Sequence, residues 1–230
     1  KERRYSRMGR SKSNLTSPGR IEISYVPQPK QEEFHCCPAD EICYGGAAGG
    51  GKSIALLMEG YVQGFETCGS YGAILRRTYP ELEKSLILKS HEYYDLRISK
   101  YNDGKHRWTT KTGKADSIID FGYCKSDLDV FQYTGAEFTF LGIDQLEQWT
   151  ELQYKFLKSR LRSTIPGAWP RIRCSANPGG IGHAWVRRYF KIHDPSLWGK
   201  PWFPEPTAAE PEPLSRCYIP ATVFDNFALM

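Results

Sequence analysis

Residues 46–53 read Gly-Ala-Ala-Gly-Gly-Gly-Lys-Ser and match the pattern G-x-x-x-x-G-K-[ST]. The glycines of such a loop let backbone N–H groups close around the phosphates of a nucleotide, while the lysine reaches the β- and γ-phosphates and the hydroxyl ligates Mg²⁺. A short apolar run precedes the loop and a segment of helical period follows it, as this chemistry requires. The residues that we expect to bind ATP are Gly46, Ala47, Ala48, Gly49, Gly50, Gly51, Lys52 and Ser53.

The segments around this loop alternate between strand-like and helix-like patterns. Apolar runs predict strands at 41–44, 71–75, 138–143 and 171–176, and alternating residues predict a hairpin over 106–123 and a last edge strand at Ile219. Helices are expected over 54–65, from about Pro80, and after a capping box at 150–153, whose helix would bury Leu152, Phe156, Leu157 and Leu161. This alternation predicts an α/β fold with a mostly parallel central sheet flanked by helices.

The chain has 230 residues, which is enough for one large α/β domain or two small ones. We expect that domain to occupy 21–230, with an extended lead-in over 21–34 and a proline-rich loop or linker over 194–214. No run approaches 18 apolar residues, so the sequence argues against a membrane span. Seven cysteines without a disulfide-like or CxxC spacing favour a reducing, intracellular setting.

The basic charge of the chain is concentrated at its start. Residues 1–20 hold seven Lys and Arg against Glu2, a local charge of +6, so the rest of the chain carries −1 of the total of +5. This composition predicts a flexible N-terminal arm that contacts nucleic acid phosphates, or equally a solvated leader that aids solubility.

A phosphate-binding loop of this kind requires a second acid to hold Mg²⁺ through its waters. Asp144 follows the apolar run 138–143, and open α/β sheets place their ligands at the carboxyl ends of their strands. We therefore expect Ser53 and Asp144 to hold Mg²⁺ together. Ser175, Ala176 and Asn177 end the next strand at the same edge; they either sense the γ-phosphate or only form a turn, and the residues alone favour the turn.

Five segments, taken in order, resemble a known family. They are 44–53 (YGGAAGGGKS), 74–82 (ILRRTYPEL), 135–150 (GAEFTFLGIDQLEQWT), 159–162 (SRLR) and 174–185 (CSANPGGIGHAW). Together they resemble the ATPase half of the large terminase subunit of tailed bacteriophages, the motor that packages DNA into a capsid. The resemblance runs from about Gln28 to Asn226.

The resemblance implies an additional-strand (RecA-like, ASCE) P-loop ATPase fold and several residue roles. Gln31 matches the adenine-reading glutamine upstream of the loop, and Lys52 and Asp144 match catalytic residues. Residues 175–177 match the segment that couples hydrolysis to movement, which reverses the preference for a simple turn. The implied partners are double-stranded DNA, the portal protein, the small terminase subunit and further copies in a ring, in the host cytoplasm and transiently at the procapsid, but not in the mature virion.

The sequence departs from the family at the expected general base. The family has Glu directly after the strand-end Asp, whereas this chain has Gln145, an amide that can hold a water but cannot take its proton. Loss of a general base typically costs about 10²–10⁴ in rate. Glu147 is the fallback, although its side chain should leave the chain in another direction two residues further on.

The sequence departs from the family at the arginine finger as well. Some relatives have Arg where this chain has Ala48, and others where it has Thr134. The remaining candidates are Arg76, Arg77, Arg160 and Arg162.

Three functions remain open at this point. The first is an ATPase that drives DNA translocation, with activity reduced by Gln145; the second is a nucleotide-binding scaffold with little turnover; the third is a P-loop kinase. Large terminases continue into a nuclease, and this chain stops at Met230, so we expect no nuclease activity from these residues.

Overall fold

The computed structural model describes residue 23 and residues 25–47, 49–208 and 210–225. Its described part contains an eight-stranded sheet of order β3-β4-β5-β2-β6-β7-β1-β8. Strands β5, β2, β6, β7, β1 and β8 pair in parallel, while β3 and β4 add an antiparallel end. The strands are β1 (Glu41–Gly46), β2 (Tyr71–Arg76), β3 (Ser99–Asn102), β4 (Arg107–Lys111), β5 (Asp116–Tyr123), β6 (Phe140–Ile143), β7 (Arg171–Ala176) and β8 (Arg216–Ala221).

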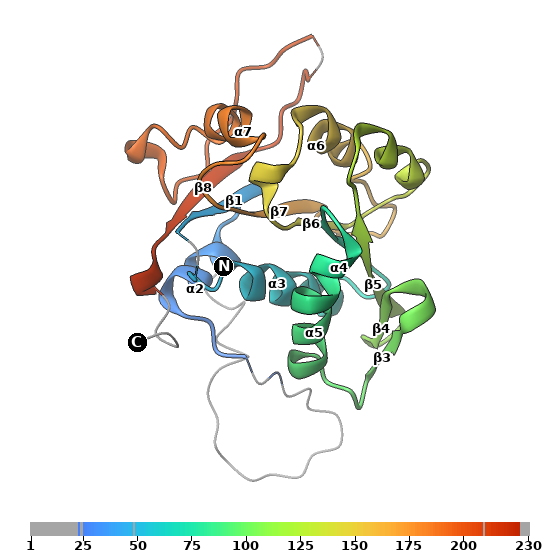
Figure 1. The fold of residues 1–230 in the computed structure, drawn as a ribbon. Helices are drawn as coiled ribbons and strands as arrows, with labels where there is room; N and C mark the ends of the chain where they lie inside the picture. The colour runs from blue at the N-terminus through green and yellow to red at the C-terminus, as the bar shows by residue number, and fades with distance from the viewer. Residues whose placement is uncertain (1–22, 24, 48, 209, 226–230) are drawn as a thin grey trace.

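The helices form a layer on each side of the sheet (Figure 1). They are α2 (Pro29–Cys36), α3 (Lys52–Glu66), α4 (Tyr79–Leu82), α5 (Leu88–Tyr93), α6 (Glu151–Lys158) and α7 (His183–Tyr189). Helices α2, α3 and α5 lie below the sheet in this view, and α6 and α7 lie above it. Two apolar cores result: Leu56 and Ile74 belong to the α3 side, and Trp149 and Val186 to the α6–α7 side.

Shorter helical turns join these elements. They are a π-helical turn at Glu83–Ile87 and 3₁₀ turns at Asp103–Lys105, Asp127–Tyr133, Leu146–Gln148, Pro195–Leu197 and Val223–Asp225. The turn Leu146–Gln148 matters most for function, because it directly follows β6 at the edge of the sheet where the glycine-rich loop lies.

The strand order brings the predicted site residues to one edge. Strand β7 lies between β1 and β6, with Gly45 opposite Ala176 and Ile143 opposite Cys174. Since all three strands are parallel, the glycine-rich loop, Asp144 and Ser175 meet at their carboxyl ends. The single strand inserted between β1 and β6 confirms the additional-strand fold.

Most element predictions are confirmed, including the hairpin of β4 and β5, the capping box at Thr150 and the edge position of β8. Two predictions are wrong. Residues 29–36 are helical, because Pro29 occupies the first turn of α2, where its missing N–H costs nothing. Leu152 is exposed, because α6 buries the face that carries Gln153, Tyr154 and Leu157. The predicted basic arm over 1–20 lies outside the described residues.

Candidate active site

The glycine-rich loop is a tight passage between β1 and α3. Gly46, Gly49 and Gly51 have φ of 130°, 86° and 70°, values that side-chain-bearing residues rarely adopt. A Cβ on Gly46 would lie 1.9 Å from the Ala221 carbonyl oxygen, so this position excludes any side chain. The Ala47 N–H donates to the same oxygen at 3.1 Å, and strand β8 therefore holds the loop in place. Ala48, also predicted to contact ATP, lies outside the described residues.

Lys52 begins α3 and turns its ammonium back onto the loop. Its Nζ donates to the Gly46 carbonyl at 3.3 Å and to the Ala47 carbonyl. Burial lowers the pKa of Lys52, while the carboxylates of Asp144 and Glu147 act in the opposite direction. The Lys52 ammonium group thus donates to two neutral carbonyls, and the oxygens of a bound phosphate can take their place as acceptors.

Gln31 reaches this loop from α2. Its Nε2 donates to the Gly51 carbonyl at 2.9 Å, and its Oε1 accepts from the Gln28 N–H at 2.9 Å. The second bond belongs to the capping box that starts α2, so the amide is held at both ends. Sequence analysis assigns Gln31 to the nucleotide site but does not predict α2, the helix on which Gln31 lies.

Asp144 lies at the end of β6 and is fully buried. Its Oδ1 accepts from the Ser53 hydroxyl at 3.0 Å and from the Ser175 hydroxyl. Among the described residues, no donor lies within hydrogen-bonding distance of its Oδ2, and the nearest cation is Arg76, whose Nε is 3.6 Å away. The structure thus joins Ser53, Asp144 and Ser175 in one cluster of oxygen atoms.

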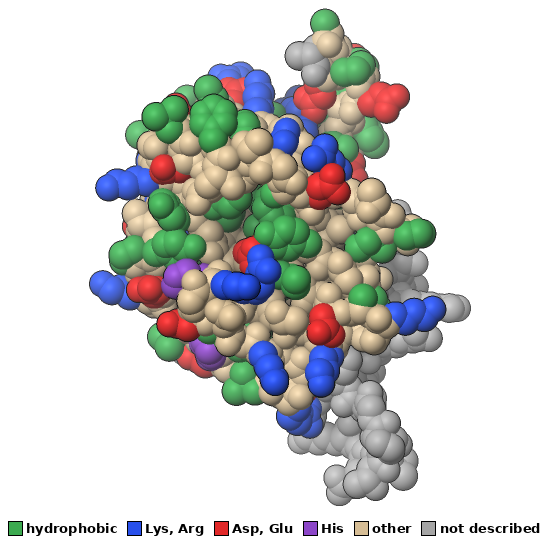
Figure 2. Space-filling model, turned by 90° about the vertical axis from the view of Figure 1, so that its right-hand side faces the viewer, with side chains coloured by type: hydrophobic (Ala, Val, Ile, Leu, Met, Phe, Trp, Pro, Cys, Tyr) green, Lys and Arg blue, Asp and Glu red, His purple; other side chains and the backbone are tan. Residues whose placement is uncertain are grey.

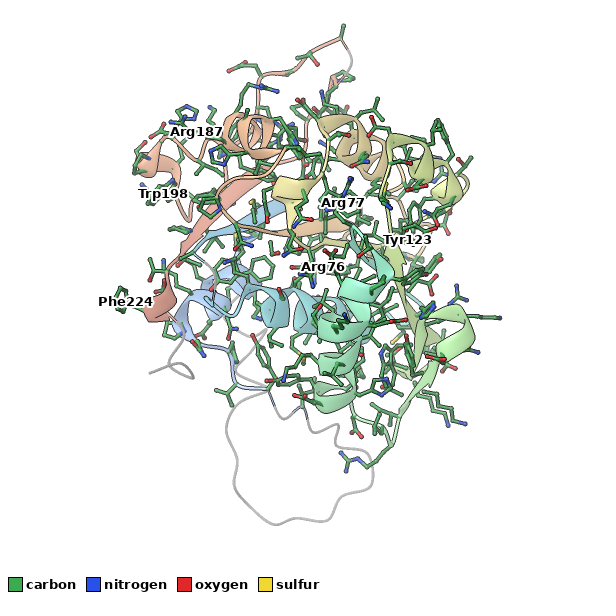
Figure 3. All side chains as sticks on the ribbon, viewed as in Figure 1. Arg76, Arg77, Tyr123, Arg187, Trp198 and Phe224 are labelled. Atoms are coloured by element: carbon green, nitrogen blue, oxygen red, sulfur yellow. The ribbon has the colours of Figure 1, made fainter. Side chains whose placement is uncertain are left out.

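Gln145 lies beside Asp144 and Arg76, just past the carboxyl end of β6. It has φ 55° and ψ 54°, the left-handed conformation, and its N–H donates to Ser175 Oγ at 3.0 Å. Its Oε1 accepts from Arg76 Nε at 2.9 Å and from Gln148 Nε2 at 3.2 Å. Arg76 in turn donates to Ser85 Oγ at 2.5 Å, on the α4–α5 side of the sheet (Figure 3).

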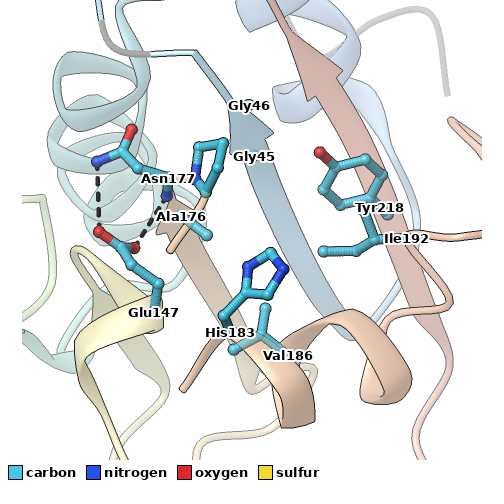
Figure 4. A pocket seen from close by; sticks show the side chains of 10 residues that line it. Gly45, Gly46, Glu147, Ala176, Asn177, His183, Val186, Ile192 and Tyr218 are labelled. Atoms are coloured by element: carbon cyan, nitrogen blue, oxygen red, sulfur yellow. Dashed lines mark hydrogen bonds between the residues drawn. The ribbon is translucent and has the colours of Figure 1, made fainter. Parts of the chain in front are cut away.

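Glu147 lines a cavity beside the loop, and its carboxylate points to Asn177 (Figure 4). Its Oε2 accepts from the Asn177 N–H at 2.9 Å and its Oε1 from Asn177 Nδ2 at 3.3 Å. Burial raises the pKa of Glu147, and the hydrogen bonds from Asn177 oppose that shift. Gly45 and Gly46 line the same cavity, so Glu147 and the start of the phosphate-binding loop border one space.

The far wall of this cavity contains residues that sequence analysis did not assign. His183 and Tyr218 line it, and His183 Nδ1 accepts from the Gly179 N–H at 3.2 Å. The position of His183 directly after the glycine-rich turn 179–182 was the available signal. No feature of the sequence indicated that Tyr218 lines this cavity, because its position depends on β8 lying next to β1.

The four arginine candidates do not all reach the site. Arg76 lies beside Asp144, whereas Arg77 donates to the Cys124 carbonyl and to Gln153, both at 3.2 Å (Figure 3). Arg160 and Arg162 hydrogen-bond through their backbones to Phe138, ahead of the amino end of β6 and at the opposite edge of the sheet. Within one chain, therefore, only Arg76 of these four approaches the loop in the described part.

A phosphate-binding loop after β1, an acid at the end of β6 and one strand between them define a P-loop NTPase of the additional-strand class. No family model and no curated protein matches the sequence. Solved structures do match. The large terminase of a thermophilic bacteriophage superposes with a TM-score of 0.63 at 15% identity, over 88% of this chain and 47% of that one.

The ATPase domain of the Thermus phage P74-26 large terminase gives a TM-score of 0.61 at 16% identity, over 90% of this chain and 85% of that domain. The terminase of the thermophilic bacteriophage in complex with ATP-γ-S gives 0.59 at 16% identity, over 88% of this chain and 46% of that one. The chain thus has the fold of phage large terminase ATPase domains and spans about half the length of the thermophilic phage protein. Within the described ranges, none of the helices is long and apolar enough to cross a bilayer.

Proposed function

We propose that this chain is the ATP-hydrolysing motor domain that drives double-stranded viral DNA into a procapsid. The observation that carries the proposal is the meeting of Lys52, Ser53 and Asp144 at one sheet edge of a fold shared with phage terminase ATPase domains. The large terminase of the thermophilic bacteriophage was solved with ADP and with ATP-γ-S, which supports nucleotide binding at the corresponding loop here.

The oxygen cluster suits a magnesium ion. Ser53 Oγ and the buried Asp144 carboxylate are hard oxygen donors, and Asp144 Oδ2 has no hydrogen-bond partner in the described part of the chain. We infer that Ser53 ligates Mg²⁺ directly and Asp144 through water. When bound, the ion neutralises negative charge on the β- and γ-phosphates.

The residues of this chain then divide the work of hydrolysis. Water attacks the γ-phosphorus, the bond to the β–γ bridging oxygen breaks, and ADP and phosphate leave. Lys52 stabilises the charge that develops on the transferred group, and Gln31 reads the adenine. Residues 175–177 transmit the change to surfaces that grip DNA.

The partners follow from the same proposal: double-stranded DNA, the portal protein, the small terminase subunit and further copies of the chain in a ring, at the procapsid in the host cytoplasm. A neighbouring copy would supply the arginine finger if Arg76 does not. A scaffold that binds ATP with little turnover is the second candidate, because Gln145 occupies the usual base position.

The test is steady-state ATP hydrolysis with and without double-stranded DNA, for the wild type, Lys52→Ala and Lys89→Ala. Lys89 is an exposed lysine paired with Glu92 on α5, and serves as the matched control. We expect DNA-stimulated hydrolysis that falls by at least about 10² in Lys52→Ala and is unchanged in Lys89→Ala. Hydrolysis that survives Lys52→Ala would refute the proposal, and ATP binding without turnover in the wild type would favour the scaffold.

A further inference from the structure

The chain reverses direction directly after Asp144, and this reversal separates two side chains that are close in sequence. Gln145 has the left-handed conformation, and the 3₁₀ turn Leu146–Gln148 follows it. As a result Gln145 hydrogen-bonds to Arg76, while Glu147 borders the cavity that Gly45 and Gly46 also line. The position next to Asp144 is therefore engaged by the Arg76 guanidinium, whereas the position three residues after Asp144 borders the cavity beside the phosphate-binding loop.

The surroundings of Gln145 would not suit a base even if it carried a carboxylate. Arg76 Nε lies 2.9 Å from Gln145 Oε1, and the same guanidinium donates to Ser85 and to the Glu81 carbonyl. A glutamate at this position would form an ion pair with Arg76, which lowers the proton affinity of a carboxylate.

Glu147 has the opposite surroundings. It is 5% exposed, and no Lys or Arg side chain of the described residues forms an ion pair with it. Burial raises the pKa of its carboxyl group, as suits a base that must accept a proton near neutral pH. Its charge also opposes the lowering of the Lys52 pKa by burial.

Asn177 restrains both oxygens of this carboxylate through its N–H and its side-chain amide (Figure 4). The Asn177 Oδ1 atom is buried and has no hydrogen-bond partner among the described residues. An unpaired buried acceptor is unfavourable, which favours a second arrangement in which Asn177 Oδ1 accepts a hydrogen bond from a water molecule in the cavity.

The segment after Asn177 packs directly on the backbone of Glu147. The Gly182 N–H donates to the Glu147 carbonyl at 2.7 Å. A Cβ on Gly180 would lie 2.3 Å from that same oxygen, so only glycine permits this approach. Because α7 begins at His183, a displacement of α7 is transmitted to the base within a few residues.

On the basis of the proposed function, we propose that Glu147 is the catalytic base and that Asn177 is a positioning residue which holds it inactive until ATP and DNA rearrange the segment 177–182. The attacking water gives its proton to Glu147 as its oxygen bonds to the γ-phosphorus and the bridging P–O bond breaks. Glu147 then returns the proton to solvent. The segment predicted to couple hydrolysis to movement thus acts by controlling the base.

The experiment compares kcat, ATP affinity and the pH profile of kcat in the full chain for five variants. We expect Glu147→Gln to lose about 10²–10⁴ in kcat with ATP affinity retained. Glu147→Asp, which keeps a carboxylate, should retain part of the activity. Gln145→Glu should give no gain, and Glu137→Gln, a change at an exposed glutamate at the opposite edge, should behave as wild type.

The fifth variant, Asn177→Ala, separates a positioning role from a structural one. We expect basal hydrolysis to rise and the stimulation by DNA to shrink, because the side-chain amide no longer restrains the base and only the backbone N–H of residue 177 still does. We also expect the acid limb of the kcat profile to move to higher pH, since the lost side-chain hydrogen bond favoured the ionised carboxylate.

The outcomes distinguish this inference from the function on which it rests. Wild-type hydrolysis that is unchanged in Glu147→Gln, or a large gain in Gln145→Glu, overturns the role of Glu147 and leaves the ATPase proposal in place. If the acid limb of the kcat profile does not move in Asn177→Ala, the proposed restraint of Glu147 by Asn177 is overturned. Absence of turnover in a wild-type chain that binds MgATP overturns both the inference and the proposed function.

Discussion

At the scale of single residues, Glu147 combines burial with a negative charge, and this combination has a cost in stability. The pKa of its carboxyl group is raised above the ordinary value of 4.5, chiefly by burial. Stability from such a group is fully present below the unfolded pKa and is lost as pH rises through the folded pKa. Ionisation of this carboxyl group is therefore less favourable in the folded chain than in the unfolded chain.

We expect Glu147→Gln to be at least as stable as the wild type at pH 8, with the advantage shrinking or reversing toward pH 4. Urea unfolding of both proteins at the two pH values measures this difference, and titration of the other groups cancels between them. The Glu137→Gln variant, changed at an exposed glutamate, should show no such trend. A Glu147→Gln variant that is less stable at pH 8 than at pH 4, relative to wild type, would contradict the assigned burial cost.

The residues of the glycine-rich loop could be predicted from sequence because the chemistry fixes their identity: only glycine fits at Gly46, and only a long cation reaches from Lys52. The different surroundings of Gln145 and Glu147 could not be predicted from sequence. They depend on a left-handed residue that is not glycine or asparagine, held in place by Ser175 from another strand. Tertiary contacts of this kind leave no local pattern.

At the scale of elements, α3 is anchored by one buried glutamate. The Glu59 carboxylate contacts three basic side chains. His35 Nδ1 of α2 lies 2.7 Å from its Oε2, and Arg171 Nε and Arg173 Nε of β7 lie 3.1 Å and 3.4 Å from its Oε1. These contacts lower its pKa despite its burial. Glu59 therefore contributes stability that is present above the unfolded pKa and is lost as pH falls.

Removing the negative charge of Glu59 leaves Arg171 and Arg173 buried without this carboxylate beside them. We expect Glu59→Gln to destabilise the chain by about 3–5 kcal/mol in urea unfolding at pH 7. Glu66, on the same helix and 2.8 Å from Arg171 Nη2 but partly exposed, is the matched control, and Glu66→Gln should cost no more than about 1 kcal/mol. Equal losses in the two variants would show that the buried cluster has no special role.

The types of most elements could be predicted because hydrophobic period and capping signals are local. The predictions for α2 and for the buried face of α6 were wrong because the local sequence pattern there is compatible with two structures. Pro29 stops a helix when it lies inside one but starts a helix when it lies at the first position, as it does in α2. On α6, the amphipathic pattern allowed two faces, and packing against the α6–α7 core selected the one with Tyr154.

At the scale of the whole molecule, alternating strands and helices predict a parallel sheet, but the strand order follows from packing. Placing β7 between β1 and β6 brings Asn177 next to Glu147, although they are thirty residues apart in sequence. The charge of the molecule is a property of the same scale. Lys and Arg lie among Asp and Glu over the face in Figure 2, and residues 21–230 carry a net charge of −1.

Such a body should bind DNA weakly, with dissociation constants of about 10⁻⁴–10⁻⁶ M, and much of the affinity should come from the basic residues at 1–20. We expect replacement of Arg3, Arg4, Arg7 and Arg10 by Gln to weaken binding to double-stranded DNA. Because each neutralised phosphate releases counterions, the slope of log K against log salt should become shallower by up to about 4. Fluorescence anisotropy between 50 and 200 mM salt, about the range where the effect is steep, measures both quantities.

The matched control replaces the same four arginines by lysine, which keeps the charge and should keep the slope. An unchanged slope in the glutamine variant would assign DNA binding to the folded body, in spite of its net charge of −1. Tight binding that ignores salt would contradict an electrostatic grip altogether. Since the four positions lie far from Lys52 in sequence, basal ATP hydrolysis without DNA should be the same in all three proteins, and only its stimulation by DNA should fall with the lost charge.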